Sequence, residues 1–90
     1  MIFEGTDQIR DTVRDVLADV LGVSADRAAA FTATTPLFGT LPELDSMAVA
    51  SVLTELEDRL GIIIEDDEVD GDLLETFGSL VDFAVRKALG

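Results

Sequence analysis

The sequence contains no cysteine and no histidine. Without cysteine there are no disulfides, thiol nucleophiles or thiolate metal ligands, and without histidine the commonest general base near neutral pH is missing. A Ser-His-Asp triad is therefore excluded, and a chain of 90 residues can scarcely enclose the cleft that a pair of catalytic carboxylates needs. These absences argue against an enzyme and against a metal site.

Basic residues are scarce as well, since 6 stand against 19 acidic residues and the formal net charge is −13. Such a charge repels nucleic acid and anionic lipid and attracts basic patches on other proteins. No stretch approaches the roughly 18–20 apolar residues of a membrane span, and residues 1–6 lack the pattern of a secretory leader. We expect a cytoplasmic monomer with protein partners, without nucleic acid and without a membrane span.

What is present suits one helical domain spanning residues 1–90. The chain is 48% hydrophobic and 28% charged, which is typical of a globular protein. Apolar residues recur at helical spacing in three stretches, at about 7–21, 46–60 and 77–89. These three stretches predict amphipathic helices that bury their apolar faces against one another.

The residues at the ends of these stretches fit helix boundaries. Thr6 or Asp7 is expected to cap the first helix, and Thr76 is expected to cap the last. Gly22 and Gly61 follow the first two helices and are expected to end them in a left-handed conformation.

A long connection, residues 23–44, separates the first two helices and contains the breakers Pro36 and Pro42. Its apolar residues predict that it packs onto the helices: Phe31, Leu37, Phe38, Leu41 and Leu44. Residues 62–64 read as an extended apolar loop, and the acidic residues 65–75 allow at most a short third helix. The expected fold is therefore an all-α four-helix bundle with a long loop between helices one and two and a short third helix.

One serine occupies a position where chemistry is expected. Asp45-Ser46-Met47 lies where the long connection meets the second helix, and the free N–H groups and positive dipole of a helix start favour an attached phosphate. An Asp-Ser pair before a helix is otherwise a common N-cap. The similar tripeptide Gly78-Ser79-Leu80 lacks a long packed loop before it, so Ser79 is expected to be structural.

The whole pattern resembles the acyl carrier protein family, from the long loop through Asp45-Ser46-Met47 to the short acidic third segment. The resemblance implies that Ser46 bears a covalent 4′-phosphopantetheine and that Asp45 helps a phosphopantetheinyl transferase hold its metal and cofactor. Met47 stands where the family usually has leucine, a residue of similar volume. The string from Thr35 to Met47 is most similar to specialised stand-alone bacterial carriers.

The resemblance also implies transport of an acyl group as a thioester, with a cavity for the chain and an acidic face for partner enzymes. The cavity residues that it implies are Val52, Leu56, Ile64, Leu74 and Val81. The partner-facing residues that it implies are Glu55, Glu57, Asp58, Glu65, Asp66 and Asp67. Expected partners are the transferase and acyl ligase, synthase or transferase enzymes with basic patches, of lipid or polyketide type.

Three other interpretations stand beside this one. An aminoacyl or peptidyl carrier has the same kind of modified serine, and an unmodified acidic interaction protein needs no serine at all. Residues 66–71 resemble the first half of a calcium loop, but Phe77 then falls where a bidentate glutamate is required. Carboxylates are also absent from residues 48–51, where family members often carry them, and this favours a dedicated partner over general fatty-acid enzymes.

Overall fold

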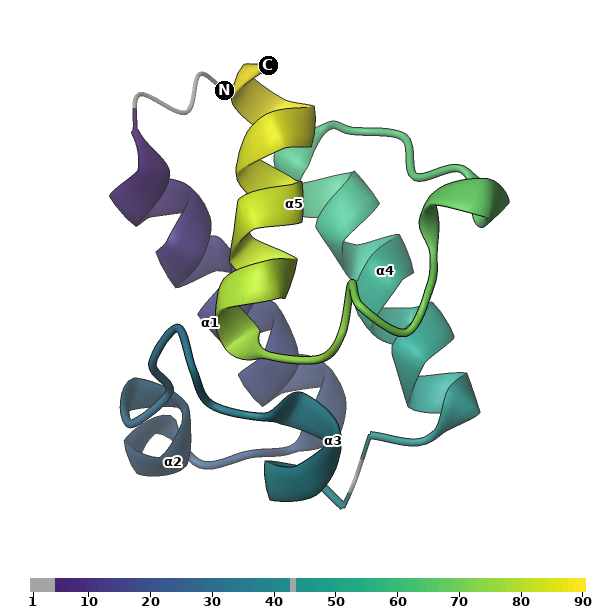
Figure 1. Cartoon of the computed structure of the whole chain (residues 1–90). Coiled ribbons are helices and arrows are strands. Elements are labelled where there is room, and N and C mark those ends of the chain that lie inside the picture. The colour runs from purple at the N-terminus through teal and green to yellow at the C-terminus, as the bar shows by residue number, and fades with distance from the viewer. Residues whose placement is uncertain (1–4, 43) are drawn as a thin grey trace.

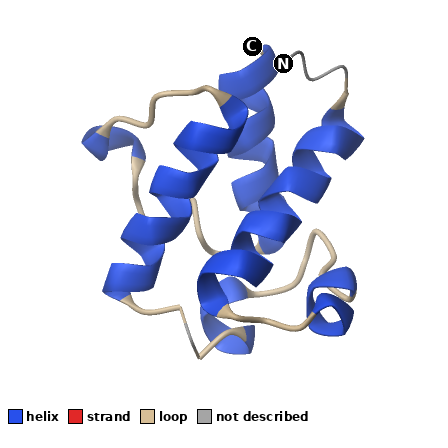
Figure 2. Cartoon of the chain, turned by 180° about the vertical axis from the view of Figure 1, so that it is seen from behind, coloured by secondary structure: helices blue, strands red, loops and turns tan. Residues whose placement is uncertain are grey.

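The computed structural model describes residues 5–42 and 44–90. Residues 1–4 and Glu43, which belong to the N-terminal stretch and the long connection of the sequence analysis, lie outside the described residues. Within the described ranges the chain is helical and forms no strand (Figures 1 and 2). The elements are α1 (Thr6–Leu21), α2 (Ala25–Ala29), α3 (Leu37–Thr40), α4 (Ser46–Leu60), the 3₁₀ turn η1 (Asp66–Glu68) and α5 (Phe77–Leu89).

Most of the predicted helix ends are confirmed. Gly22 and Gly61 follow α1 and α4 with φ of 68° and 65°, the left-handed region that favours glycine. The Thr76 side chain accepts from the N–H of Ser79 and so caps α5. The predicted cap of α1 by Thr6 or Asp7 is wrong: Gly5 is the N-cap residue, with no side-chain cap. Both side chains already lie within the first turn, and Asp7 pairs with Arg10 instead.

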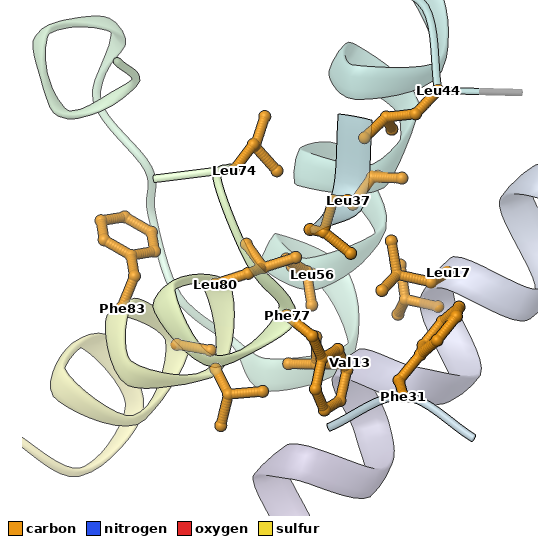
Figure 3. Packing of buried hydrophobic residues seen from close by; sticks show 14 of the residues in the cluster. Val13, Leu17, Phe31, Leu37, Leu44, Leu56, Leu74, Phe77, Leu80 and Phe83 are labelled. Carbon is orange, nitrogen blue, oxygen red and sulfur yellow. The ribbon is translucent and has the colours of Figure 1, made fainter. Parts of the chain in front are cut away.

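The core lies between the three long helices, with α1 in contact with both α4 and α5. The largest fully buried side chains come from all three helices and from the long connection (Figure 3): Phe77, Ile9, Leu17, Leu37, Leu41, Leu56, Leu80, Val13, Val16 and Val52. The rings of Phe31 and Phe77 pack at a centroid distance of 5.6 Å. The predicted apolar faces are thus buried together, and the loop residue Phe31 extends the core.

The long connection packs against the helices as expected, with one exception. Phe31, Leu37, Leu41 and Leu44 are buried, whereas Phe38 is 53% exposed. The single turn of α3 places Leu37, and Leu41 directly after it, toward the core. The Phe38 side chain lies on the other side of this turn and points to solvent. The chain therefore shows a large apolar side chain in the segment that leads to α4.

Three backbone hydrogen bonds fasten this connection to the start of α5. The N–H of Leu37 donates to the carbonyl of Glu75 (3.1 Å), that of Phe77 to Thr35 (2.9 Å), and that of Gly78 to Ala33 (3.0 Å). A Cβ at position 78 would lie 2.5 Å from the carbonyl oxygen of Ala33, so this close approach requires glycine. The connection is therefore fixed at its centre and not only at its ends.

The predicted short third helix is a single turn. Within residues 65–75 only Asp66–Glu68 is helical, as one 3₁₀ turn closed by a reciprocal capping box between Glu65 and Glu68. Repulsion among neighbouring carboxylates and the flexibility of Gly71 oppose a longer helix. Residues 62–64 form neither helix nor strand, as predicted.

Candidate functional site

Ser46 is the first residue of α4, and its neighbour Asp45 caps the helix. The Asp45 Oδ1 accepts from the N–H of Ala48 at 2.8 Å, with Asp45 in extended backbone. Ser46 itself is exposed, and no described residue forms a hydrogen bond with its hydroxyl. The capping interpretation of the Asp-Ser pair therefore holds for Asp45, while the Ser46 hydroxyl is left available for modification.

The start of α4 suits an anionic group on Ser46. The backbone ladder of the helix begins where the N–H of Val49 donates to the Asp45 carbonyl at 2.9 Å. The N–H groups of Ser46 and Met47 precede that ladder and lie at the positive end of a helix of 15 residues. The first turn carries no acidic residue, so no carboxylate of that turn competes with an attached phosphate.

A groove of about 460 Å³ opens beside Ser46, between α4 and the segment that contains η1. Its apolar surface consists of Val49, Leu53, Ile64 and Val69, with Glu57 and Asp66 among the remaining lining residues. The apolar members are half-buried and pack against the core. The groove thus offers an apolar surface within reach of a group attached to Ser46.

The five predicted cavity residues do not share this groove. Ile64 lines it, whereas Val52, Leu56, Leu74 and Val81 are buried in the packed core. Sequence reasoning missed Val49, Leu53 and Val69 as lining residues. Val49 and Leu53 belong to the same helical period as Val52 and Leu56, and periodicity alone does not separate half-buried positions at the edge of a stripe from buried ones at its centre. The predicted inner cavity stays a prediction.

The six predicted partner-facing carboxylates divide into two groups. Asp58, Glu65, Asp66 and Asp67 are exposed. Glu55 and Glu57 are half-buried and bonded within the chain. Glu55 Oε2 accepts from Arg59 Nε (2.9 Å), and Glu57 Oε2 accepts from the N–H of Ile64 (2.8 Å).

Arg59 joins α4 to α1 at the far end of the site helix. Its guanidinium donates to Asp19 at 2.8 Å as well as to Glu55, and the hydrogen bonds to Asp19 and then to Glu55 raise its pKa above the usual range. Glu55 therefore takes part in a small ion-pair network, and this removes part of its charge from the partner-facing surface.

The α4 surface nearest Ser46 carries no charge. Met47, Ala50, Ser51 and Thr54 are exposed, and Met47 has 83% of its surface in solvent. The first acidic residue after Ser46 on this helix is Glu55. The exposed Phe38 adds a second apolar side chain in the connection just before the site.

The other chemical candidates are bonded elsewhere. The Ser79 hydroxyl donates to the carbonyls of Thr76 (2.8 Å) and Leu73 (3.0 Å), which confirms its structural role. In the segment that resembles a calcium loop, Asp70 Oδ1 accepts from the N–H of Leu73 (2.9 Å), and Glu68 binds Lys87. Within residues 5–42 and 44–90 no three acidic side chains come together as a metal site.

The described residues form an all-α bundle with an exposed serine at the start of a capped helix, an arrangement that suits a carrier domain. A family model described as a phosphopantetheine attachment site matches residues 11–84. The chain therefore belongs to the acyl carrier protein family of phosphopantetheine-binding carriers.

A solved structure supports the same conclusion. The chain is similar to the holo acyl carrier protein of Nitrosomonas europaea, determined by solution NMR, with 42% sequence identity and a TM-score of 0.77. The match covers 88% of this chain and 93% of that one. The cofactor of this family is a covalently attached 4′-phosphopantetheine, and interaction with transferases and synthases follows from the carrier role. Among the described helices, none is long and apolar enough to cross a membrane.

Proposed function

We propose that Ser46 is the attachment residue and that the protein carries acyl groups for lipid or polyketide-type enzymes. One observation carries this proposal: the Ser46 hydroxyl is exposed and forms no hydrogen bond with a described residue, while Asp45 caps the start of α4. The family match spans this position. We extend the proposal to a single carrier domain over residues 1–90, acting as a cytoplasmic monomer.

The residues around Ser46 fit the cofactor. A phosphodiester on Oγ would lie next to the N–H groups of Ser46 and Met47, at the positive end of α4. The terminal thiol of the arm supplies the chemistry, because it holds the cargo as a thioester. Asp45, exposed apart from its one cap bond, can also meet the metal and cofactor held by a transferase.

The groove favours an acyl cargo over an aminoacyl or peptidyl cargo. Val49, Leu53, Ile64 and Val69 offer an apolar surface to a chain that returns from the arm, and burying each methylene contributes roughly 0.8 kcal/mol. A charged amino group gains no such stabilisation from these four apolar side chains. The core residues Val52, Leu56, Leu74 and Val81 would take part only if the bundle opened.

The surface charge favours a partner that has basic residues at one place and an apolar contact at another. Asp58, Glu65, Asp66 and Asp67 present carboxylates to basic residues. The uncharged surface of Met47, Ala50 and Ser51 lies nearer to Ser46, so the partner needs an apolar contact beside its active-site opening. This arrangement supports a dedicated ligase or synthase rather than general fatty-acid enzymes.

The cargo proposal can be tested by loading apo protein with acyl-phosphopantetheine from acyl-coenzyme A donors of increasing chain length. The melting temperature should rise with chain length in the wild type and rise less in Leu53→Ala. Val20→Ala is a matched control, because Val20 lies on α1, is half-buried and is not among the residues that line the groove. Equal rises in all three proteins, or a larger rise with an aminoacyl cargo, would contradict an acyl-binding groove.

A further inference from the structure

The acidic segment of residues 65–72, here called the strap, connects two anchored points (Figure 1). Before it, the N–H of Ile64 donates to Glu57 of α4. After it, Leu73 and Leu74 are buried in the core. Six of its eight residues are acidic, so their mutual repulsion opposes a compact arrangement.

An ion pair joins the strap to α5. Glu68 Oε1 accepts from Lys87 Nζ at 2.9 Å, across 19 positions of sequence. The same oxygen accepts from the backbone N–H of Glu65 at 2.9 Å and closes the η1 turn. The two side chains are only 27% and 29% exposed, so this ion pair is better shielded than an ordinary surface pair. A single carboxylate oxygen therefore shapes the turn and binds it to the last helix.

The strap is also the wall between two hollows. Asp66 and Val69 line the groove beside Ser46. Glu68 and Asp70 line a hollow of about 610 Å³ on the α5 side, together with Phe83 and Arg86. A displacement of the strap away from α5 would therefore widen the hollow on the α5 side and narrow the groove beside Ser46.

We propose that Lys87 is a latch that holds the strap against α5 and thereby sets the width of the groove beside Ser46. Lys87 supplies the positive charge that offsets the repulsion within the strap. When the ion pair with Glu68 breaks, the η1 turn keeps its internal capping bond but loses its attachment to α5. The part of the strap before Val69, whose side chain packs against the core, then moves relative to α5 and changes access to the groove. The significance of the groove rests on the proposed function, whereas the latch itself does not.

Hydrogen exchange on the apo protein tests the latch directly. In Lys87→Met, the amides of residues 65–72 should exchange roughly threefold faster or more, while those of α1 and the middle of α4 keep their wild-type rates. Arg10→Met is the matched control, because it removes the same charge from an ion pair with Asp7 on α1, away from the strap. Equal acceleration in both variants, or uniform acceleration over the whole chain, would overturn the proposal.

Two further variants separate a latch from a loss of packing. Lys87→Arg keeps the charge and should restore slow exchange in the strap. Glu68→Gln keeps an oxygen for the Glu65 N–H but removes the ion pair, so Lys87→Met/Glu68→Gln should exchange no faster than either single variant. Additive acceleration would show that the two residues act independently and would refute the latch.

An environment-sensitive fluorophore, attached through a coenzyme A derivative, extends the test to the groove. The fluorophore should report a more polar environment in Lys87→Met than in Arg10→Met. If no variant accepts the label at all, the proposed function fails while the exchange result still decides the latch. If both variants accept it and give identical emission, the latch does not control the groove.

Discussion

The Asp45 side chain accepts a hydrogen bond from the N–H of Ala48, and the hydroxyl of Ser46, the first residue of α4, is bonded to none of the described residues. The cap stabilises the end of α4 that presents the serine. Asp45→Ala should therefore destabilise the protein by about 1 kcal/mol, whereas Asp45→Asn, which also caps helices, should leave stability close to wild type. Chemical denaturation measures both.

The same pair of variants separates capping from the interaction with the transferase. If the Asp45 charge helps the transferase, Asp45→Asn should be modified more slowly than wild type despite normal stability. A stable Asp45→Asn variant that is modified at the wild-type rate would assign Asp45 to capping alone.

Gly78 should tolerate no side chain. A Cβ there would meet the Ala33 carbonyl oxygen at 2.5 Å, so Gly78→Ala must break the backbone contact that fastens the long connection. We expect a loss of at least about 1 kcal/mol in the free energy of unfolding. Gly71→Ala is the control, because a Cβ there meets nothing within 4 Å, and its stability should equal or slightly exceed that of wild type. Equal losses in both variants would contradict the close approach.

The Glu68 contacts predict a pH dependence on the acid side. Its hydrogen bond from Glu65 and then that from Lys87 lower its pKa below the ordinary 4.5. Because the folded pKa is depressed, its stabilising contribution is complete above about 4.5 and is lost as the pH falls through the folded value. The difference in melting temperature between wild type and Glu68→Gln should therefore be largest near neutral pH and shrink at acid pH. If the difference in melting temperature is the same at neutral pH and at pH values below 4.5, the ion pair does not contribute as described.

The uncharged start of α4 should determine which enzymes recognise the carrier. Ala48→Glu/Ser51→Glu places carboxylates where many family members have them, so loading by general fatty-acid enzymes should increase several-fold. Ala25→Glu/Ala29→Glu, which adds the same two charges at exposed positions of α2, controls for net charge. Unchanged loading of the double variant would refute the idea of a dedicated partner surface.

Local chemistry made much of this fold predictable. The long helices follow from apolar periodicity, and their ends follow from Gly22, Gly61 and Thr76, because each signal acts within one turn of its helix. The helix start at Ser46 was likewise identifiable, since its long preceding connection is visible in the sequence. The exposure of Phe38 could not be predicted from the sequence, because it depends on the direction of a single helical turn.

Tertiary contacts account for what the sequence left out. Neither the bond from Ile64 to Glu57 nor the Glu68 pair with Lys87 follows from a local pattern, and both turn apparent surface carboxylates into structural groups. The lining of the groove also depends on tertiary contacts. The sequence marks Leu53 and Leu56 equally as apolar, and only the packing of η1 and the strap decides which of them lines an opening.

The intact mass of the protein after incubation with coenzyme A and a broad-specificity phosphopantetheinyl transferase tests the central claim most directly. Wild type and Ser51→Ala, which removes an exposed serine five positions further along α4, should each gain one phosphopantetheine. Ser46→Ala should gain none, with circular dichroism showing that it is folded. A phosphopantetheine on Ser46→Ala, or none on folded wild type, would contradict Ser46 as the attachment residue.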